Sequence, residues 1–312
     1  MIQQKYFTKN KCKFNSPFIT MGTFDGVHLG HRKLIKELVT RSKAAGLQSV
    51  VITYYHHPLE TIFKNTFPYL LTEIKIREKI IYDLGVDCIL YLNFTKSLAD
   101  IPPNEFLEKV IFKELHPQEI VVGYDTHFGK DRRGNFDFLK QHEELYNYKV
   151  DCVEPFRLNG KIVSSSWCRE CVRAGAVDTL KNLLGRSYSI NGTITSGNRL
   201  GHKIGFPTVN ILWHDPNKLI PKNGIYLSKV FWGNKQLWGV TNIGFRPTVI
   251  DKSDLTVETH ILDFDQEIYG QNISITFETR LRTEYKLRDQ EELIEYIKND
   301  IKTAREIIKQ RD

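Results

Sequence analysis

The sequence predicts an α/β domain with a doubly wound parallel sheet, followed by an antiparallel β-barrel domain that ends in an α-helix. Three observations support this fold class. Segments typical of strands and helices alternate up to about residue 150, short strand-like segments separated by turn residues follow from Tyr188, and an amphipathic helical pattern covers residues 289–309. The change of pattern near residue 184 predicts two domains, 1–184 and 185–312.

In the first domain, runs of apolar and β-branched residues predict buried strands. Apolar residues at helical spacing predict the helices between them, one with Thr72 as its N-cap and one over residues 103–115 with proline at its start. In such folds ligands bind at the carboxyl ends of the parallel strands. The strands expected in this domain cover residues 18–24, 49–55, 86–92 and 119–124, and those of the barrel cover residues 189–195, 225–231, 237–242, 256–262 and 273–281.

Composition restricts the class of protein. The chain has 312 residues, a formal net charge of +7 and 41% hydrophobic residues, which is ample for two cores. No apolar run approaches the roughly 18 residues of a membrane span, and residues 1–13 are too polar for a secretory signal, so we expect a soluble, cytoplasmic protein without a membrane partner. The positive charge suits nucleic acid or anionic small molecules, and no basic run favours nucleic acid as a partner.

The five cysteines are irregularly spaced and do not suggest a disulfide framework. Cys168 and Cys171 form a C-x-x-C pair, but no second pair at metal-ligand spacing accompanies it. We therefore interpret these two cysteines as residues of a helix face. Self-association is left open.

A ten-residue string at residues 22–31 reads G-T-F-D-G-V-H-L-G-H. It follows a predicted strand and begins a predicted helix, so His28 and His31 lie at a strand-to-helix turn and share a helix face. The unpaired N–H groups and the dipole of a helix start favour phosphate, and Gly22 and Gly30 let backbone approach a ligand. Two imidazoles there can stabilise charge as an α-phosphate is attacked. A lone histidine would more often only cap the turn, whereas the whole string favours nucleotide chemistry.

This string resembles the H-x-G-H signature of nucleotidyltransferases, and its F-D-G-V-H form is similar to the bacterial bifunctional riboflavin kinase/FMN adenylyltransferase family, also called FAD synthetases. The resemblance implies catalytic roles for His28 and His31. It also implies an ATP-binding site that includes Gly22, Phe24, Asp25 and Gly30.

A glycine-containing string at residues 121–134, V-V-G-Y-D-T-H-F-G-K-D-R-R-G, follows another predicted strand. Its Asp125 is placed to face a nucleotide and its metal, although a solvated charged loop is an equal alternative. The string is similar to the G-x-D-F-x-F-G string of the same family, with Thr126 in place of the usual phenylalanine.

The string V-S-S-S-W-C-R at residues 163–169 resembles the family's I-S-S-T-x-I-R. The resemblance implies that Ser164 and Ser165 bind the ATP phosphates and that Arg169 is catalytic, since a guanidinium donates two hydrogen bonds to phosphate at once. By themselves, serines ahead of a helix are ordinary caps.

A second constellation, G-H-K-I-G-F-P-T-V-N, lies at residues 201–210 of the predicted barrel. Gly201 and Gly205 open the loop, and Thr208 and Asn210 are two apart, so on a strand they face the same side. A hydroxyl and an amide oxygen suit Mg²⁺, a hard cation that takes few protein ligands. Ordinary surface polarity of a strand is the alternative.

This string resembles the G-x-x-x-G-[FY]-P-T-A-N motif of riboflavin kinases. Matching strings follow in the family's order: N-G-I-Y at 223–226, G-V-T-N-I-G at 239–244 and V-E-T-H at 257–260. The resemblance implies that Glu258 accepts the proton of the flavin 5′-hydroxyl, and that Thr208 and Asn210 hold Mg²⁺. It implies ATP contacts from Gly201, Lys203, Gly205 and Pro207, and flavin contacts from Asn242 and Arg282.

Together the two resemblances span nearly the whole chain. They imply phosphorylation of riboflavin by ATP to FMN, and then adenylylation of FMN by ATP to FAD with release of pyrophosphate. Three alternatives remain: a riboflavin kinase whose first domain is inactive or altered, suggested by Thr126, Ser166 and Cys168; a non-catalytic flavin- or RNA-binding regulator; and a cytidylyltransferase, which the kinase-like barrel argues against.

Overall fold

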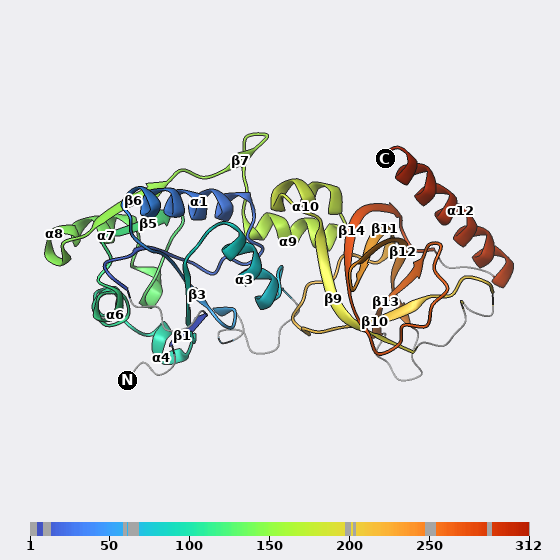
Figure 1. Cartoon of the computed structure of the whole chain (residues 1–312), viewed down its shortest axis with the longest axis horizontal. Coiled ribbons are helices and arrows are strands. Elements are labelled where there is room, and N and C mark those ends of the chain that lie inside the picture. Colours follow the sequence, from blue (N-terminus) through green and yellow to red (C-terminus); the bar gives the residue numbers. More distant parts are fainter. Residues whose placement is uncertain are drawn as a thin grey trace. The chain divides into compact units, whose positions relative to one another are not determined.

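The computed structural model describes residues 5–8, 14–58, 61, 69–196, 201, 204–246, 254–285 and 289–311. Its contacts divide the chain into two compact units, Met1–Ser165 and Ser166–Asp312 (Figure 1). The boundary predicted at residue 184 concerns the division of activities and stays a prediction.

The first unit is built on a six-stranded sheet in the order β1-β4-β3-β2-β5-β6. Strands β2 to β6 are parallel, and β1 pairs antiparallel with β4. The predicted parallel sheet is therefore confirmed, with an antiparallel strand β1 and a parallel strand β6 that the sequence pattern did not predict. The strands are β1 (Lys5–Thr8), β2 (Phe18–Met21), β3 (Ser49–Tyr54), β4 (Cys88–Leu92), β5 (Glu119–Gly123) and β6 (Lys149–Val153).

Helices cover both faces of this sheet, which explains why its strands read as continuous apolar runs. Alternate strand residues belong to two core clusters: Val51 packs with Ile35 and Leu38 of α1, whereas Val50 packs with Leu107 and Val110. The helices and remaining short strands are α1 (Leu29–Ala44), α3 (Ile74–Asp83), α4 (Lys96–Ala99), α5 (Pro103–Phe106), a π-helical turn (Leu107–Phe112), α6 (Lys113–Leu115), a 3₁₀ turn (Lys130–Arg132), α7 (Phe136–Gln141), α8 (Glu143–Tyr146), β7 (Arg157–Leu158) and β8 (Lys161–Ile162).

Two local predictions differ in detail from the structure. The N-cap predicted at Thr72 is wrong, because α3 begins at Ile74 with Glu73 in the cap position. The backbone N–H of Thr72 instead donates to the carboxylate of Asp25. The helix predicted at 103–115 is present as a whole, but its middle is π-helical.

The second unit is a closed antiparallel barrel in the strand order β10-β13-β12-β11-β14-β9. Strand β9 alternates strictly between buried and half-buried residues, as a barrel strand must. The predicted barrel is confirmed, and so is its terminal helix, whose N-cap Asp289 accepts from the backbone N–H of Glu292 at 2.9 Å. The elements are α9 (Ser165–Ala174), α10 (Val177–Leu184), β9 (Tyr188–Thr195), β10 (Val209–Trp213), β11 (Gly224–Trp232), β12 (Lys235–Arg246), β13 (Asp254–Ile261), β14 (Asn272–Arg282) and α12 (Gln290–Lys309).

Cys168 and Cys171 lie buried on α9 and form no disulfide. Within the described ranges, no group of three or more His, Cys, Asp and Glu side chains is arranged to hold a metal ion. No helix in the same ranges combines the length and hydropathy that a bilayer crossing requires.

Candidate functional sites

The turn between β2 and α1 is tightly wound. Phe24, Gly26 and Val27 all have positive φ values, at 51°, 88° and 39°. The two non-glycine residues sit in a conformation that side chains disfavour, and burial of both holds them there. A Cβ on Gly22 would lie 3.2 Å from the Phe24 ring, so that position needs a small residue. The turn is thus fixed by packing before any ligand binds.

The two signature histidines stack on one another at the start of α1. His28 is the N-cap, and its Nδ1 accepts from the backbone N–H of His31 at 3.3 Å. The ring centroids are 3.7 Å apart with an interplanar angle of 16°. A Cβ on Gly30 would lie 3.1 Å from the His28 ring, so glycine there leaves room for this stack. The structure therefore places both imidazoles at a helix N-terminus, where phosphate is favoured.

Asp25 connects the turn to distant segments. Its buried carboxylate accepts from the backbone N–H groups of Leu71 and Thr72 at 3.0 Å, and so holds the segment that leads into α3. Its backbone carbonyl accepts from Ser165 Oγ at 2.9 Å. The predicted serine segment is thus joined to the histidine turn, with the half-buried Ser164 next to it. Arg169 follows one helical turn later on α9, beyond the boundary of the two units, and its role stays a prediction.

Arg77 of α3 supports the same turn and was not predicted as a site residue. It is 1% exposed and donates to the carbonyls of Thr23 at 3.1 Å and Tyr54 at 2.6 Å, so it joins the ends of β2 and β3. Its guanidinium lies 5.8 Å from the Tyr91 ring centroid, and burial raises the pKa of that phenol although the cation lowers it in part. The sequence held a signal, because Arg77 stands at helical spacing with the apolar residues Ile80, Ile81 and Leu84.

The loop after β5 presents Asp125 at the carboxyl edge of the sheet, exposed to solvent. Thr126, which replaces the phenylalanine of the resembling string, closes a tight turn: its Oγ1 accepts from the backbone N–H of Gly123 at 3.0 Å. Phe128 fills the core, and a Cβ on Gly134 would collide with its ring at 2.5 Å. The loop is therefore well packed with threonine at 126, while nucleotide contact by Asp125 stays a prediction.

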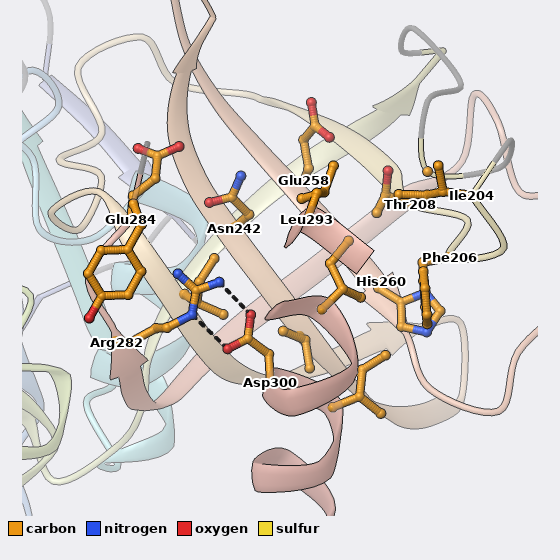
Figure 2. Close-up of a pocket in the computed structure, with 16 residues that line it drawn as sticks. Ile204, Phe206, Thr208, Asn242, Glu258, His260, Arg282, Glu284, Leu293 and Asp300 are labelled. Carbon is orange, nitrogen blue, oxygen red and sulfur yellow. Dashed lines mark hydrogen bonds and ion pairs between the residues drawn. The ribbon is translucent and has the colours of Figure 1, made fainter. Parts of the chain in front are cut away.

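The barrel carries a cavity of about 270 Å³ on its outer face, beside α12 (Figure 2). Its polar lining comes mainly from Thr208 and from β12, β13 and β14, and its apolar lining comes from the loop at 204–206, β11, β12 and α12. The lining residues are Gly201, Ile204, Phe206, Thr208, Ile225, Val240, Asn242, Glu258, His260, Arg282, Glu284, Tyr285, Leu293, Ile297, Asp300 and Ile301.

Strand register explains the polar part of this cavity. Glu258 on β13 pairs with Asn210 on β10 and with Asn242 on β12, so these three side chains form one row on the same face. Their neighbours Val257 and Thr259 are buried inside the barrel, which leaves the row on the outside, where the cavity lies. The side chain of Glu258 therefore points out of the barrel and lines the cavity.

These oxygen-bearing groups fit a divalent cation. Thr208 lines the cavity two residues before Asn210, and hydroxyl, amide and carboxylate oxygens are ligands that Mg²⁺ prefers. In addition, Oδ1 of Asn242 is buried and accepts no hydrogen bond from the described residues. The structure thus brings together the residues that the sequence assigned to metal, proton transfer and flavin contact, while the individual roles stay predictions.

The loop before β10 is shaped by its glycines. Gly201 accepts from the backbone N–H of Phe206 at 2.8 Å, and a Cβ at position 201 would collide with the Phe206 carbonyl at 2.4 Å. Gly205 has φ of 85°. The carbonyl of Pro207 accepts from Nδ1 of His260 at 2.8 Å, which ties the loop to β13. Lys203, predicted to bind ATP, lies outside the described residues.

Comparison with known proteins identifies the family. The family model of FAD synthetase matches residues 11–167, and that of riboflavin kinase matches residues 184–308. A bifunctional riboflavin kinase/FMN adenylyltransferase from Buchnera aphidicola is 33% identical over 95% of this chain and 96% of its own length. The chain belongs to the bifunctional riboflavin kinase/FMN adenylyltransferase family. The protein of the same name from Escherichia coli is 32% identical over 92% of this chain and 91% of its own.

A crystal structure described as a macrolide-efflux protein from Streptococcus pneumoniae has a TM-score of 0.85 and 27% identity, and the match covers 93% of this chain and 94% of that one. It shares the fold of this riboflavin kinase/FMN adenylyltransferase chain over nearly its whole length. The resemblance found from the sequence is therefore confirmed, and both family models match in the predicted order. The alternatives of a riboflavin kinase with an inactive or altered first domain and of a non-catalytic flavin- or RNA-binding regulator are not favoured.

Arg282, predicted to contact flavin, lines the kinase cavity but is already engaged. Its Nε and Nη2 donate to the two carboxylate oxygens of Asp300 on α12, at 2.8 and 2.7 Å. Its Nη1 donates to the carbonyl of Thr283, and the rings of Tyr285 and Tyr296 have centroids 5.3 and 5.0 Å from the guanidinium carbon. Sequence reasoning missed Asp300 and the role of α12 as a cavity wall, although the helix itself was predicted.

Proposed function

We infer that the chain makes FMN from riboflavin and ATP in its barrel, and then makes FAD and pyrophosphate from FMN and ATP in its α/β unit. The observation that carries this function is the coincidence of two sites with the two family models: stacked histidines at a helix N-terminus in the first, and an oxygen-rich row beside an apolar wall in the second. A mononucleotide flavin is the product of one reaction and the substrate of the other.

In the kinase reaction, Glu258 accepts the proton of the flavin 5′-hydroxyl as that oxygen attacks the γ-phosphate of ATP, and the bond between the γ-phosphorus and the bridging oxygen breaks to release ADP. Thr208 and Asn210 would hold Mg²⁺, which supplies charge neutralisation on the phosphates when bound. Gly201, Gly205 and Pro207 shape the loop that carries Thr208, and Gly201 lies at the cavity wall. The apolar wall of the cavity would accommodate the isoalloxazine ring, and Asn242 the polar part of the flavin.

In the adenylyl transfer, the phosphate of FMN attacks the α-phosphate of ATP, so the protein needs no nucleophile. His28 and His31 neutralise the charge that develops on the α-phosphate, and the first N–H groups of α1 bind the other phosphates. Asp25 and Ser165 hold this turn in place through the hydrogen bonds described above. Contributions of Arg169 and Asp125, and a cytoplasmic location, belong to the same proposal.

The experiment is product analysis. The purified chain is incubated with Mg²⁺, ATP and either riboflavin or FMN, and the flavins are separated by chromatography. FAD from both incubations, with FMN as intermediate in the first, is the expected result. FMN alone from riboflavin, with no FAD from FMN, would leave only a riboflavin kinase. Flavin retained without turnover of ATP would instead indicate a binding protein.

A further inference from the structure

Helix α12 supplies the apolar wall of the kinase cavity. Leu293, Ile297 and Ile301 line it at intervals of four residues, and none of the three is fully buried by the protein itself. The buried residues of α12 are Asp300 and Ala304. A carboxylate and an alanine give little hydrophobic adhesion, so the attachment of this helix depends strongly on what Asp300 binds.

Asp300 binds Arg282 in a fork-to-fork ion pair, shown by the dashed lines in Figure 2. The Asp300 side chain is 9% exposed and that of Arg282 is 20% exposed, so the pair is shielded from water and strong. The Nε and Nη2 atoms of Arg282, which could otherwise donate two hydrogen bonds to a ligand, point to Asp300 on α12. Tyr285 and Tyr296, one before α12 and one on it, flank the same guanidinium.

We propose that Asp300 is a positioning residue for riboflavin: through its pair with Arg282 it holds α12 against the barrel and so completes the apolar wall of the flavin site. Arg282 then acts on the flavin through the helix and makes no direct contact with it. This inference rests on the kinase activity proposed above. In the proposed kinase reaction ATP binds through the loop at 201–208 and through Mg²⁺ held by Thr208 and Asn210. Loss of the pair should therefore raise KM for riboflavin and leave KM for ATP unchanged.

The chain offers a matched control. A second two-bond pair, Arg305 to Asp263 at 2.6 and 3.1 Å, also joins α12 to the barrel, but both residues lie outside the cavity lining. The Asp263 side chain is 73% exposed, so this pair is worth little in water. Replacing Asp263 therefore removes a two-bond contact of the same helix that is exposed to water and lies outside the wall.

The test measures KM for riboflavin, KM for ATP and kcat of FMN formation in the full chain for Asp300→Asn, Arg282→Met, the double variant and Asp263→Asn. If the docked helix falls to a tenth of the population, KM for riboflavin rises about tenfold. We expect that rise for Asp300→Asn and for Arg282→Met, and no further rise in the double variant, because both changes break the same pair. KM for ATP and the rate of FAD formation from FMN should change less than about twofold in every variant. KM for riboflavin should also change less than about twofold in Asp263→Asn.

Several outcomes would overturn the inference. If Arg282→Met raises KM for riboflavin while Asp300→Asn leaves it unchanged or lowers it, Arg282 contacts flavin directly. If Asp263→Asn matches Asp300→Asn, general loosening of α12 is responsible. If KM for ATP rises as much as KM for riboflavin, the pair does not act on the flavin wall. An unchanged kcat of FMN formation at saturating riboflavin reports that the barrel of each variant is folded, and absence of FMN formation by the unaltered chain would overturn the proposed function itself.

Discussion

The two sites of this chain are assembled in opposite ways. In the first unit, the two histidines expected to act on phosphate lie in one turn, where His28 caps the helix that carries His31. In the second, the cavity combines a loop, four strands and α12, with contributions from Gly201 to Ile301. The histidine turn is local in sequence, and its backbone conformation makes it rigid. The kinase cavity exists only when distant elements are held together.

This difference teaches where each site is vulnerable. The histidine turn depends on buried supports, namely the Asp25 carboxylate and the Arg77 guanidinium, which bind backbone groups. The kinase cavity depends on strand register for its polar row and on one ion pair for its wall. Substitutions in one unit should therefore leave the activity of the other intact, and the predictions below can break that separation.

The largest effect is expected for His28→Ala. The change removes one imidazole of the stack and the cap of α1, so FAD formation from FMN should fall on the order of 100- to 1,000-fold, because a preorganised charge-stabilising group is lost. FMN formation from riboflavin should be retained. Separate rate measurements from riboflavin and FMN test this, with the exposed His116→Asn as control. Loss of both activities in folded protein would contradict the separation.

The reciprocal change is Glu258→Gln. It keeps the shape of the side chain but removes the proton acceptor, so kcat of FMN formation should fall about 100-fold with FAD formation from FMN retained. The exposed Glu267→Gln serves as control on the same barrel. An unchanged kcat would assign Glu258 to the surface polarity of its strand.

Arg77→Met probes the support of the histidine turn. Two carbonyls, of Thr23 and Tyr54, would lose their charged donor, so the free energy of unfolding should fall by roughly 2–3 kcal/mol. FAD formation should fall about tenfold through misplacement of the turn. Arg77→Lys should recover part of both losses, since it restores one donor. Denaturant unfolding and the rate from FMN measure the two effects; equal loss of FMN formation would argue against a local role.

The smallest effect concerns Glu278 in the second unit. Burial raises the pKa of its carboxyl group, but hydrogen bonds from Ser187 and Lys181 lower it by more, so the pKa lies below its usual value. A depressed folded pKa gives stability that is present above the unfolded value near 4.3 and is lost as pH falls through the folded value. Glu278→Gln should therefore lower stability by about 1 kcal/mol at neutral pH. The difference in melting temperature between Glu278→Gln and the unaltered chain should disappear below about pH 4. A difference that stays constant with pH would exclude the charge of Glu278 as its cause.

The sequence predicted what is local or periodic. It placed β2 to β5, five of the six barrel strands and the terminal helix, because alternation and helical spacing are read from neighbouring residues. It missed β1, whose partner β4 lies far along the chain, and also β6 and β10, which are short and carry polar residues among the apolar ones. It also missed the π-helical turn at Leu107–Phe112, which has no period of its own in so short a run.

Some residues of the candidate sites could likewise be predicted from the sequence, and others could not. The glycines, histidines and the 201–210 string were visible as motifs, whereas the buried Arg77 and the pairing of Arg282 with Asp300 follow from folding alone. Arg282 illustrates the limit best. Its position in the cavity was predicted, but the atoms that its guanidinium binds depend on where a helix that begins eight residues later comes to lie.

The first two helices of the second unit restrict how the chain can be cut into working pieces. The Asp178 carboxylate of α10 accepts from Thr279 on β14, Lys181 pairs with Glu278, and the carbonyl of Val172 on α9 accepts from the backbone N–H of Lys222. A fragment starting at residue 185 would strip these partners from the barrel and leave the Glu278 carboxylate short of a cation. A fragment expressed to phosphorylate flavin should therefore begin before α9. Fusion proteins that contain the barrel should also include α9 and α10.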